Sequence, residues 1–175
     1  ADVVEHLHGL PLHHLPVHAA PLLEKAREGV VFIRLGPRDV GDGPLQAGVR
    51  AQVPRLDVLV NNAGIGFGAP GEGRQVSADG HELRFAVNYL APVLLTRLLV
   101  PLLTASAPSR VVNVGSLGQV PFDPADAEFE HGYTGVDAYR RSKLALAAFT
   151  IDLAGELRAA RVTVNCLHPA TFMDT

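Results

Sequence analysis

From Leu56 onward, short apolar runs alternate with longer segments in which apolar residues recur at helical spacing. The short runs have the length and the β-branched content of strands, and they are Asp57 to Asn61, Arg110 to Val114 and Val162 to Leu167. Two longer segments, about Gly80 to Leu103 and Asp137 to Ala160, predict helices. Strands that are apolar throughout and separated by helices form crossover units, so the pattern predicts an α/β fold with a doubly wound parallel sheet.

The second predicted helix has sequence signals for its start and for its buried face. Asp137 is expected to be its N-cap. Leu144, Ala148 and Ile151, together with Phe149, are expected to build the apolar face that packs on the sheet. Ligands of a doubly wound sheet lie beyond the carboxyl ends of its strands, so functional residues are expected at that edge.

Residues 1–55 do not show this alternation, and within them only Val30 to Arg34 is typical of a strand. Histidines are interleaved there with prolines, at His6, His8, His13, His14 and His18. No cysteine or acidic residue stands at ligand spacing, and proline breaks any helix that would align the imidazoles, so no metal site is expected. We therefore expect an atypical N-terminal segment at 1–55 and an α/β portion at 56–175.

Composition and charge restrict the class of protein. The chain has 175 residues, of which 47% are hydrophobic and 19% charged, as is typical of one globular domain with a substantial core. Its net charge is −3 and it has no basic stripe, so neither nucleic acid nor an anionic membrane surface is expected as a partner. The longest apolar stretch, Leu90 to Leu103, contains Pro92, Arg97 and Pro101 and is too short for a membrane span.

The single cysteine, Cys166, excludes an intrachain disulfide framework and fits a reducing compartment. Cys166 is expected to be a small buried residue on its strand. No N-terminal segment combines a basic start with an apolar run, so no signal peptide is expected and the protein is expected to be cytoplasmic.

Tyr139 and Lys143 are the strongest candidates for chemistry. They stand four residues apart on the second predicted helix, so both side chains project from one face. Ser116 follows the Arg110 to Val114 strand, which places it at the carboxyl end of that strand. A phenol has an ordinary pKa of about 10, and a nearby ammonium favours its ionised form. Such a tyrosine can take a proton from an alcohol as hydride leaves, or return it to a carbonyl, while the serine stabilises the substrate oxygen.

These residues and their neighbours resemble the short-chain dehydrogenase/reductase family over Leu56 to Thr175. The motifs occur in the family's order, and they are DVLVNNAG at Asp57 to Gly64, Asn88 in a helix, VVNVGS ending at Ser116, AYRRSKLAL around Tyr139 and Lys143, and His168-Pro169-Ala170-Thr171. The resemblance implies a Rossmann-like domain and an NAD(P)-dependent oxidoreductase. It also implies NAD or NADP as the cofactor and a small alcohol or carbonyl compound as the substrate.

The resemblance implies a role for each matching residue. Tyr139 is the acid and base, and Lys143 holds the nicotinamide ribose. Ser116 is the catalytic serine, and Asn88 holds a water in the proton relay. Besides Tyr139 and Lys143, the residues implied to border the cofactor are Asn61, Asn62, Ala63, Gly64, Pro169, Ala170, Thr171 and Thr175. Asn61 and Asn62 are also typical turn formers at a strand end.

The stretch from Ser116 to Tyr139 is longer than the family's usual spacing. With Phe122-Asp123 and the sequence DGHE that opens the first helix, it resembles the retinol-dehydrogenase-like branch, which implies a lipophilic substrate. In this family the two long helices often pack against a partner subunit, which implies a homo-oligomer. Tyr133 has no lysine four residues on, so it is expected to be a loop residue.

The family's glycine-rich phosphate turn is not found. Gly66, Gly68 and Gly71 spell a dinucleotide fingerprint, but Pro70 lies inside it, and the segment is expected to be a loop. By its position in the sequence, Val30 to Arg34 corresponds to the family's third strand, so the chain is expected to be truncated at both ends. A catalytically inactive fragment, or an interaction module of the same fold, is the alternative to an active enzyme. The NNAG and VNVGS segments argue against the epimerases and dehydratases that share the tyrosine and lysine pair.

Overall fold

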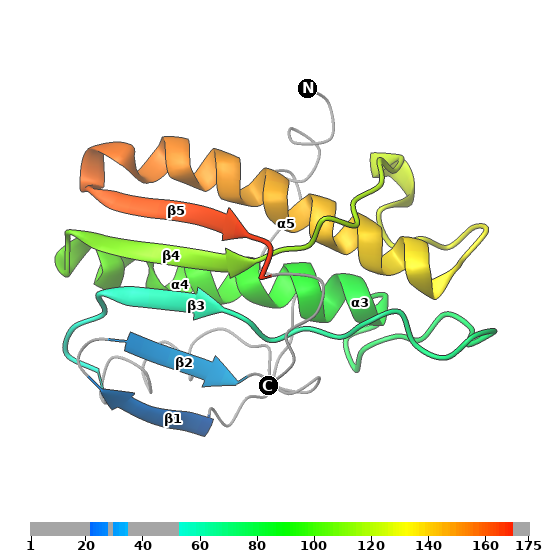
Figure 1. Ribbon diagram of the computed structural model, residues 1–175, viewed down its shortest axis with the longest axis horizontal. Helices are drawn as coiled ribbons and strands as arrows, with labels where there is room; N and C mark the ends of the chain where they lie inside the picture. Colours follow the sequence, from blue (N-terminus) through cyan, green and yellow to red (C-terminus); the bar gives the residue numbers. More distant parts are fainter. Residues whose placement is uncertain (1–21, 28–29, 35–52, 170–175) are drawn as a thin grey trace.

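A computed structural model of the chain describes residues 22–27, 30–34 and 53–169, which contain one five-stranded sheet. The strands are β1 (Leu22–Arg27), β2 (Val30–Arg34), β3 (Val58–Asn61), β4 (Ser109–Val114) and β5 (Val162–Leu167). They lie in sequence order across the sheet (Figure 1). β2 and β5 have the predicted bounds, and β3 and β4 each differ from the prediction by one residue at their start.

The strands from β2 to β5 are parallel, which confirms the α/β fold with a parallel sheet. β2 lies directly beside β3, with Val30 opposite Val58. In the 3-2-1-4-5-6 strand order of a doubly wound sheet, the neighbour of the fourth strand is the first strand. DVLVNNAG, the sequence of β3 and its turn, resembles the family's fourth strand. β2 therefore lies in the place of the first strand, which contradicts its assignment to the third strand from sequence position.

β1 is a second strand in a segment where only one was expected. It runs antiparallel to β2, with Leu22 opposite Arg34 (Figure 1). Its sequence LLEKAR consists largely of residues that favour helices. Pairing with β2 supplies the extended conformation that the local sequence does not indicate, because strand formation depends strongly on neighbouring strands.

Two long helical segments connect the strands. The first consists of α3 (Leu83–Phe85), the π-helical turn η2 (Ala86–Leu90) and α4 (Ala91–Ala105), and the second of α5 (Gly135–Leu157) followed by the 3-10 turn η4 (Arg158–Ala160). A further 3-10 turn, η3 (Pro124–Asp126), lies in the stretch between β4 and α5. α5 begins two residues before its predicted start because Thr134, and not Asp137, is the N-cap. Thr134 Oγ1 accepts a hydrogen bond of 3.1 Å from Asp137 N.

α4 and α5 cover the same face of the sheet. On this face Asn61 of β3 and Asn113 of β4 are neighbours in register, and Asn61 Nδ2 donates to Asn113 Oδ1 over 2.7 Å. Asn61 also donates to Thr96 of α4 (2.9 Å), and Asn113 donates to Thr150 of α5 (2.8 Å). These four buried side chains form a polar ladder that joins both helices to the sheet.

The apolar core lies between this face of the sheet and the two helices. Leu59, Val111 and Val164 are in register on adjacent strands, and all three are buried. On the opposite face, Thr163 and Asn165 of β5 are exposed. In the described part of the chain, α4 and α5 therefore cover one face of the sheet (Figure 1).

The buried face of α5 differs from the predicted one. Phe149 is buried as expected, but Ile151 is 74% exposed, and Leu144 and Ala148 are only partly buried. The buried residues are Ala138, Ser142, Lys143, Ala145, Leu146, Phe149, Thr150, Leu153 and Leu157. Lys143 and Thr150 turn toward the sheet because both find hydrogen-bond partners on β4. Hydrophobicity alone therefore misplaces this face.

The segment Leu83–Ala105 forms a continuous helix of 23 residues, and by length and composition it could cross a membrane. It is longer than the Leu90 to Leu103 stretch considered from the sequence because α3 and η2 extend α4 toward its N-terminus. Leu95, Leu99 and Leu103 of this segment lie in the core against the sheet. Core helices of soluble proteins have the same length and composition, so the segment carries no conclusion about a membrane.

Candidate active site at the carboxyl edge of the sheet

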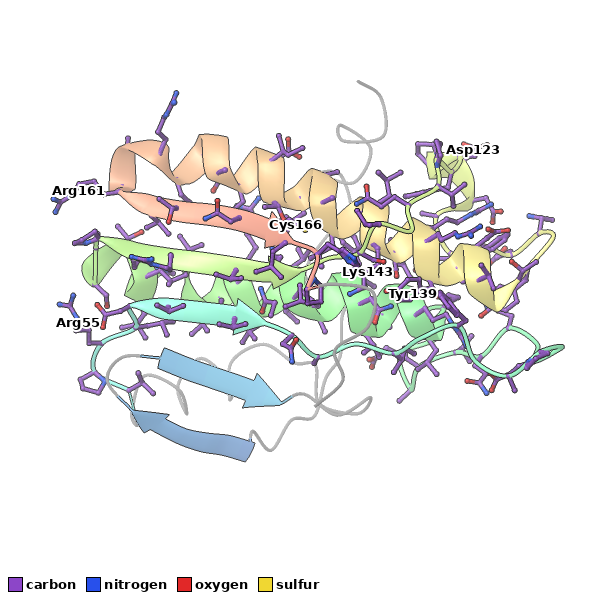
Figure 2. The ribbon with its side chains drawn as sticks, viewed as in Figure 1. Arg55, Asp123, Tyr139, Lys143, Arg161 and Cys166 are labelled. Carbon is purple, nitrogen blue, oxygen red and sulfur yellow. The ribbon has the colours of Figure 1, made fainter. Side chains whose placement is uncertain are left out.

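α5 presents Tyr139 and Lys143 at the carboxyl ends of the parallel strands. Lys143 Nζ lies 5.8 Å from the centre of the Tyr139 ring. The same ammonium donates a hydrogen bond of 2.8 Å to the carbonyl oxygen of Val114, the last residue of β4. Figure 2 shows the two side chains close together beside the ends of β4 and β5. The end of β4 and the pair on α5 are therefore brought together at one edge.

Lys143 is almost fully buried, with 6% of its surface exposed. Burial lowers the pKa of Lys143, and a charge interaction with Cys166 partly opposes this shift. Among the residues that the structure describes, Nζ makes one hydrogen bond, whereas an ammonium has three donors. Two N–H groups of Lys143 are thus available to a further group that carries oxygen acceptors.

Asn88 has no exposed surface and joins three segments. Its Oδ1 accepts from Ile65 N (2.8 Å), and its Nδ2 donates to Ile65 O (3.1 Å) and to Ser142 Oγ (3.0 Å). Ser142 Oγ in turn donates to the backbone oxygen of Tyr139 (2.7 Å). The side chain of Asn88 therefore ties the loop after β3 to the turn of α5 that carries Tyr139.

Gly64 brings the backbone of the loop after β3 close to these side chains. A Cβ atom at Gly64 would lie 3.2 Å from Asn88 Oδ1 and 3.7 Å from Lys143 Nζ. The first of these contacts is tighter than ordinary van der Waals contact, so a side chain here would push against Asn88. The absence of a side chain leaves the loop backbone open beside the ammonium.

Ser116 lies two residues beyond the end of β4 and is partly buried. Its Oγ accepts a hydrogen bond from Gly118 N (3.2 Å), and its carbonyl accepts one from Gln119 Nε2 (2.9 Å). Gly115 N donates to Leu167 O (2.8 Å), which joins the end of β4 to the end of β5. The turn that carries Ser116 is therefore fixed at the same edge as Lys143.

Phe67 packs its ring against Tyr139. The ring centres are 4.8 Å apart and the rings are nearly perpendicular, at 83°. Phe67 also lines a surface cavity of about 580 Å³ between the loop 67–74 and residues 133–136, and half of its own surface is exposed. One apolar ring therefore borders both the tyrosine and this cavity.

The sequence pattern does not indicate the contacts that join three residues of this region, namely Arg84, Glu82 and Tyr133. Tyr133 is a loop residue as expected, but its hydroxyl accepts from Arg84 (2.8 Å) and donates to Glu82 (3.0 Å). Burial, followed by the charge of Glu82, raises the pKa of Tyr133 to about 12. The only sequence signal is that two charged residues lie within an apolar helical segment, which does not reveal a partner about 50 positions away.

The long stretch between Ser116 and Tyr139 packs on α5 through Arg141. The guanidinium of Arg141 lies 3.5 Å from the centre of the Phe129 ring and 6.0 Å from that of Phe122. It also donates to the carbonyl oxygen of Asp126 (3.3 Å). Phe122 and Phe129 are buried, so this insertion is an ordered part of the site's surroundings.

The remaining residues expected at the cofactor fall into three groups. Asn61 is buried on the side facing the helices and bonds Thr96 and Asn113, so its side chain has a structural role. Asn62, Ala63 and Pro169 are exposed. Ala170, Thr171 and Thr175 lie outside the described residues, as do the five histidines predicted to form no metal site.

Cys166 is exposed, which corrects the expectation that it is buried. β5 is the edge strand of the described sheet, so its end is open on one side. Partial burial raises the pKa of the thiol, while a hydrogen bond with Thr150 and the charge of Lys143 oppose this shift. Figure 2 shows Cys166 close to Lys143.

Comparison with known protein families agrees with this fold and with the candidate site at the carboxyl edge of the sheet. The sequence model of the short chain dehydrogenase family matches residues 44–175, which is more than half of the chain. The chain therefore belongs to the short-chain dehydrogenase family.

Individual relatives narrow the similarity to one branch of the family. The chain is 49% identical over 120 residues to human retinol dehydrogenase 14 and 43% identical over 119 residues to human retinol dehydrogenase 13. Each match covers 66% of this chain and 34% of the relative, so the chain spans about a third of the length of these relatives. The resemblance to the retinol-dehydrogenase-like branch is confirmed as a similarity of sequence.

Solved structures show the same fold. A metagenomic short-chain oxidoreductase in complex with NADP is 32% identical with a TM-score of 0.54, over 74% of this chain and 53% of that chain. A short-chain oxidoreductase from Brucella ovis in complex with a partially ordered NAD is 34% identical with a TM-score of 0.50, over 71% of this chain and 53% of that chain. These similarities confirm the Rossmann-like fold of the described residues.

Proposed function

We propose that this chain is the catalytic portion of an NAD(P)-dependent oxidoreductase that interconverts an alcohol and a carbonyl compound. The observation that carries the proposal is the buried Lys143 ammonium, 5.8 Å from the centre of the Tyr139 ring. A tyrosine that can exchange a proton with a substrate and a cationic side chain that has N–H donors beyond its bond to Val114 therefore lie side by side at the carboxyl edge of the sheet. The family membership and the NADP and NAD complexes of two similar proteins support the same chemistry.

The residues at this edge fit a nicotinamide cofactor. A ribose presents neighbouring hydroxyl oxygens that accept hydrogen bonds, and Lys143 has two N–H donors beyond the one that it gives to Val114. The open backbone at Gly64 leaves room for close approach beside the same ammonium. Lys143, Tyr139 and the turn Asn62 to Gly64 would hold the cofactor. The family resemblance implies that Pro169, Ala170, Thr171 and Thr175 border it as well. When bound, the cofactor supplies or accepts the hydride.

Tyr139 moves the proton in the proposed reaction. Its hydroxyl takes the proton of the alcohol in oxidation and returns a proton to the carbonyl oxygen in reduction. Lys143 lies beside this tyrosine, with its ammonium 5.8 Å from the ring centre. Ser116 donates a hydrogen bond to the substrate oxygen and stabilises its developing negative charge.

The side chain of Asn88 is already hydrogen-bonded, through its N and O atoms, to Ile65 and Ser142. Both of its N–H donors are used by Ile65 and Ser142, and its oxygen accepts from Ile65. We therefore assign the side chain to positioning Tyr139 and the loop after β3. The relay water expected from the family resemblance would have to be held by a backbone atom of the π-helical turn η2.

A lipophilic substrate is proposed on two grounds. The similarity to retinol dehydrogenases supports an apolar alcohol or aldehyde. Phe67, which contacts Tyr139, and the adjoining cavity offer an apolar surface next to the reacting phenol.

Binding and turnover test the proposal separately. The full chain is titrated with NADH and with NADPH by calorimetry, and turnover is then measured with medium-chain and retinoid alcohols and aldehydes. We expect saturable binding of at least one cofactor and turnover that Tyr139→Phe abolishes without loss of cooperative unfolding. A chain that unfolds cooperatively but binds neither cofactor at millimolar concentration is an inactive fragment or an interaction module, and the proposal is then wrong.

A further inference from the structure

The guanidinium of Arg84 is buried between the loop after β3 and the segment that precedes α5. Arg84 is 3% exposed. Its Nε donates to Gly66 O (2.9 Å) and its Nη2 to Phe67 O (2.8 Å), while Nη1 donates to Tyr133 Oη (2.8 Å). One side chain therefore holds two consecutive carbonyls of the loop and, at the same time, the insertion that carries Tyr133.

The charge of Arg84 is balanced within the same cluster. Nη1 lies 3.7 Å from Glu82 Oε1, and Nη2 lies 3.5 Å from Glu72 Oε2. Glu82 is also buried and accepts from Tyr133 Oη (3.0 Å) and Phe85 N (2.6 Å). A buried cation with carboxylate partners and satisfied donors holds its position firmly, because any displacement leaves a charge buried without a partner.

The loop needs this support because its own backbone is permissive. Glycines stand at positions 66, 68, 71 and 73, and Gly68 and Gly71 have φ values of +81° and +78°. Glycine can adopt many backbone conformations, so contacts with other segments must fix the conformation of this loop. Arg84 makes such a contact with the backbone of Phe67, whose ring packs edge-on against Tyr139.

The first turn of α5 also lies against the carbonyl of Phe67. A Cβ atom at Gly135 would clash with Phe67 O. The first turn of α5 thus packs directly against the carbonyl that Arg84 binds, and there is no free space in which that carbonyl could shift toward the helix.

We propose that Arg84 is a positioning residue: by fixing the carbonyls of Gly66 and Phe67 it holds the Phe67 ring against Tyr139 and sets the orientation of that phenol. The role rests on the proposed function, since it concerns the tyrosine assigned as acid and base. The fork of Arg84 is needed for it, because the three donors of a lysine sit on one rotating nitrogen and cannot reach two carbonyls and a phenol at separate fixed positions.

Fluorine NMR tests the positioning without reference to activity. The chain has three tyrosines, Tyr89, Tyr133 and Tyr139, so protein labelled with 3-fluorotyrosine gives three signals that single Phe substitutions assign. We expect Arg84→Lys and Arg84→Met to shift or broaden the signals of Tyr139 and Tyr133. Arg97→Lys is the matched control, because Arg97 pairs with Glu156 on the surface, and it should leave the Tyr139 signal unchanged.

Two further variants keep the test decisive if Arg84→Met does not fold. Phe67→Leu removes the ring contact at a half-exposed position, and Gly135→Ala displaces the Phe67 carbonyl while Arg84 remains. Both should shift the Tyr139 signal. If Phe67→Leu shifts it but Arg84→Lys and Gly135→Ala do not, Arg84 does not position the tyrosine and the inference is overturned.

Kinetics then link the position to the reaction. We expect Arg84→Lys and Phe67→Leu to lower kcat about tenfold, because small misplacements of a reacting group are costly, while cofactor affinity stays within about twofold. An unchanged kcat in Arg84→Lys, in a protein where Tyr139→Phe is inactive, contradicts the inference. Turnover that survives Tyr139→Phe contradicts the proposed function instead, and the NMR result still decides whether Arg84 fixes the ring.

Discussion

The amide of Asn88 donates to Ser142 Oγ over 3.0 Å and thereby joins the π-helical turn η2 to α5. The hydroxyl of Ser142 in turn donates a hydrogen bond to the backbone oxygen of Tyr139. A residue expected to hold a water is thus, by its side chain, a connection between two helical segments and the loop at Ile65.

Asn88→Ala is expected to lower the free energy of unfolding by about 2–4 kcal/mol. The variant leaves the N–H and C=O of Ile65 and the hydroxyl of Ser142 without their partner in a buried site, and each lost partner costs roughly 1 kcal/mol or more. Urea denaturation monitored by circular dichroism measures the change. Ser142→Ala removes one of these contacts and should cost about 1 kcal/mol. Equal losses for the two variants would argue against the three-way connection.

Lys143→Met is expected to stabilise the free protein by about 1 kcal/mol while it weakens cofactor binding more than tenfold. Burial lowers the pKa of Lys143, so the folded state disfavours the ammonium, and stability should rise as the pH rises toward the ordinary value of about 10.4. Thermal unfolding and cofactor titration of the same samples give both numbers. A loss of stability without any loss of affinity would show that Lys143 is a structural residue.

Tyr89 is expected to make the protein unstable in alkali. Burial, followed by the charge of Asp152, raises the pKa of Tyr89 to about 12. The pKa of a tyrosine in the unfolded chain is about 10. Because the folded state raises the pKa of Tyr89, the neutral phenol stabilises the fold below about pH 10, and this contribution is lost as the pH rises toward 12. The loss amounts to about 2–3 kcal/mol. Urea midpoints between pH 9 and pH 12 should fall less steeply in Tyr89→Phe, and an unchanged slope would contradict the assignment.

The ion pair of His81 and Glu128 is expected to make stability depend on pH near neutrality. The hydrogen bond of 2.7 Å to Glu128 is the main cause that raises the pKa of His81, and burial opposes it. The stabilisation is fully present below the ordinary histidine pKa of about 6.5 and is lost as the pH rises through the raised value. Both groups are partly exposed, so the size is at most about 1 kcal/mol.

The His81 prediction has a matched control on the surface. His81→Gln should flatten the pH dependence of the urea midpoint between pH 5.5 and pH 8.5. His131, whose side chain is 87% exposed, is the control, and His131→Gln should leave the dependence as it is. The same slope in wild type and His81→Gln would exclude the pair as its source.

The strands and the chemistry of α5 could be predicted because their signals are local. The β-branched runs gave β2 and β5 with the observed bounds, and the spacing of Tyr139 and Lys143 put both on one helical face. The start of α5 was misplaced for a reason that is also local: Thr134 and Asp137 are both good caps, and Thr134 takes the cap while its Oγ1 accepts from Asp137 N.

What the sequence could not supply are relationships between distant segments. The face of α5 was misjudged because Lys143 and Thr150 are polar yet turn inward to partners on β4, which leaves Ile151 outside. Arg84 and Tyr133 meet across about 50 positions, and nothing near either residue indicates the other. The division at residue 55, the cytoplasmic location and the homo-oligomer stay predictions.

Neither α4 nor α5 can separate from the sheet alone without breaking a buried hydrogen bond of the polar ladder. Lifting α4 breaks the hydrogen bond between Thr96 and the amide of Asn61, and lifting α5 breaks the one between Thr150 and the amide of Asn113, so either movement loses a buried polar contact. Half-open states of this kind are unfavourable, so the two helices should detach as one cooperative unit, with slow and matched amide hydrogen exchange. The carboxyl edge that carries Tyr139 should therefore open only when α4 and α5 both detach from the sheet.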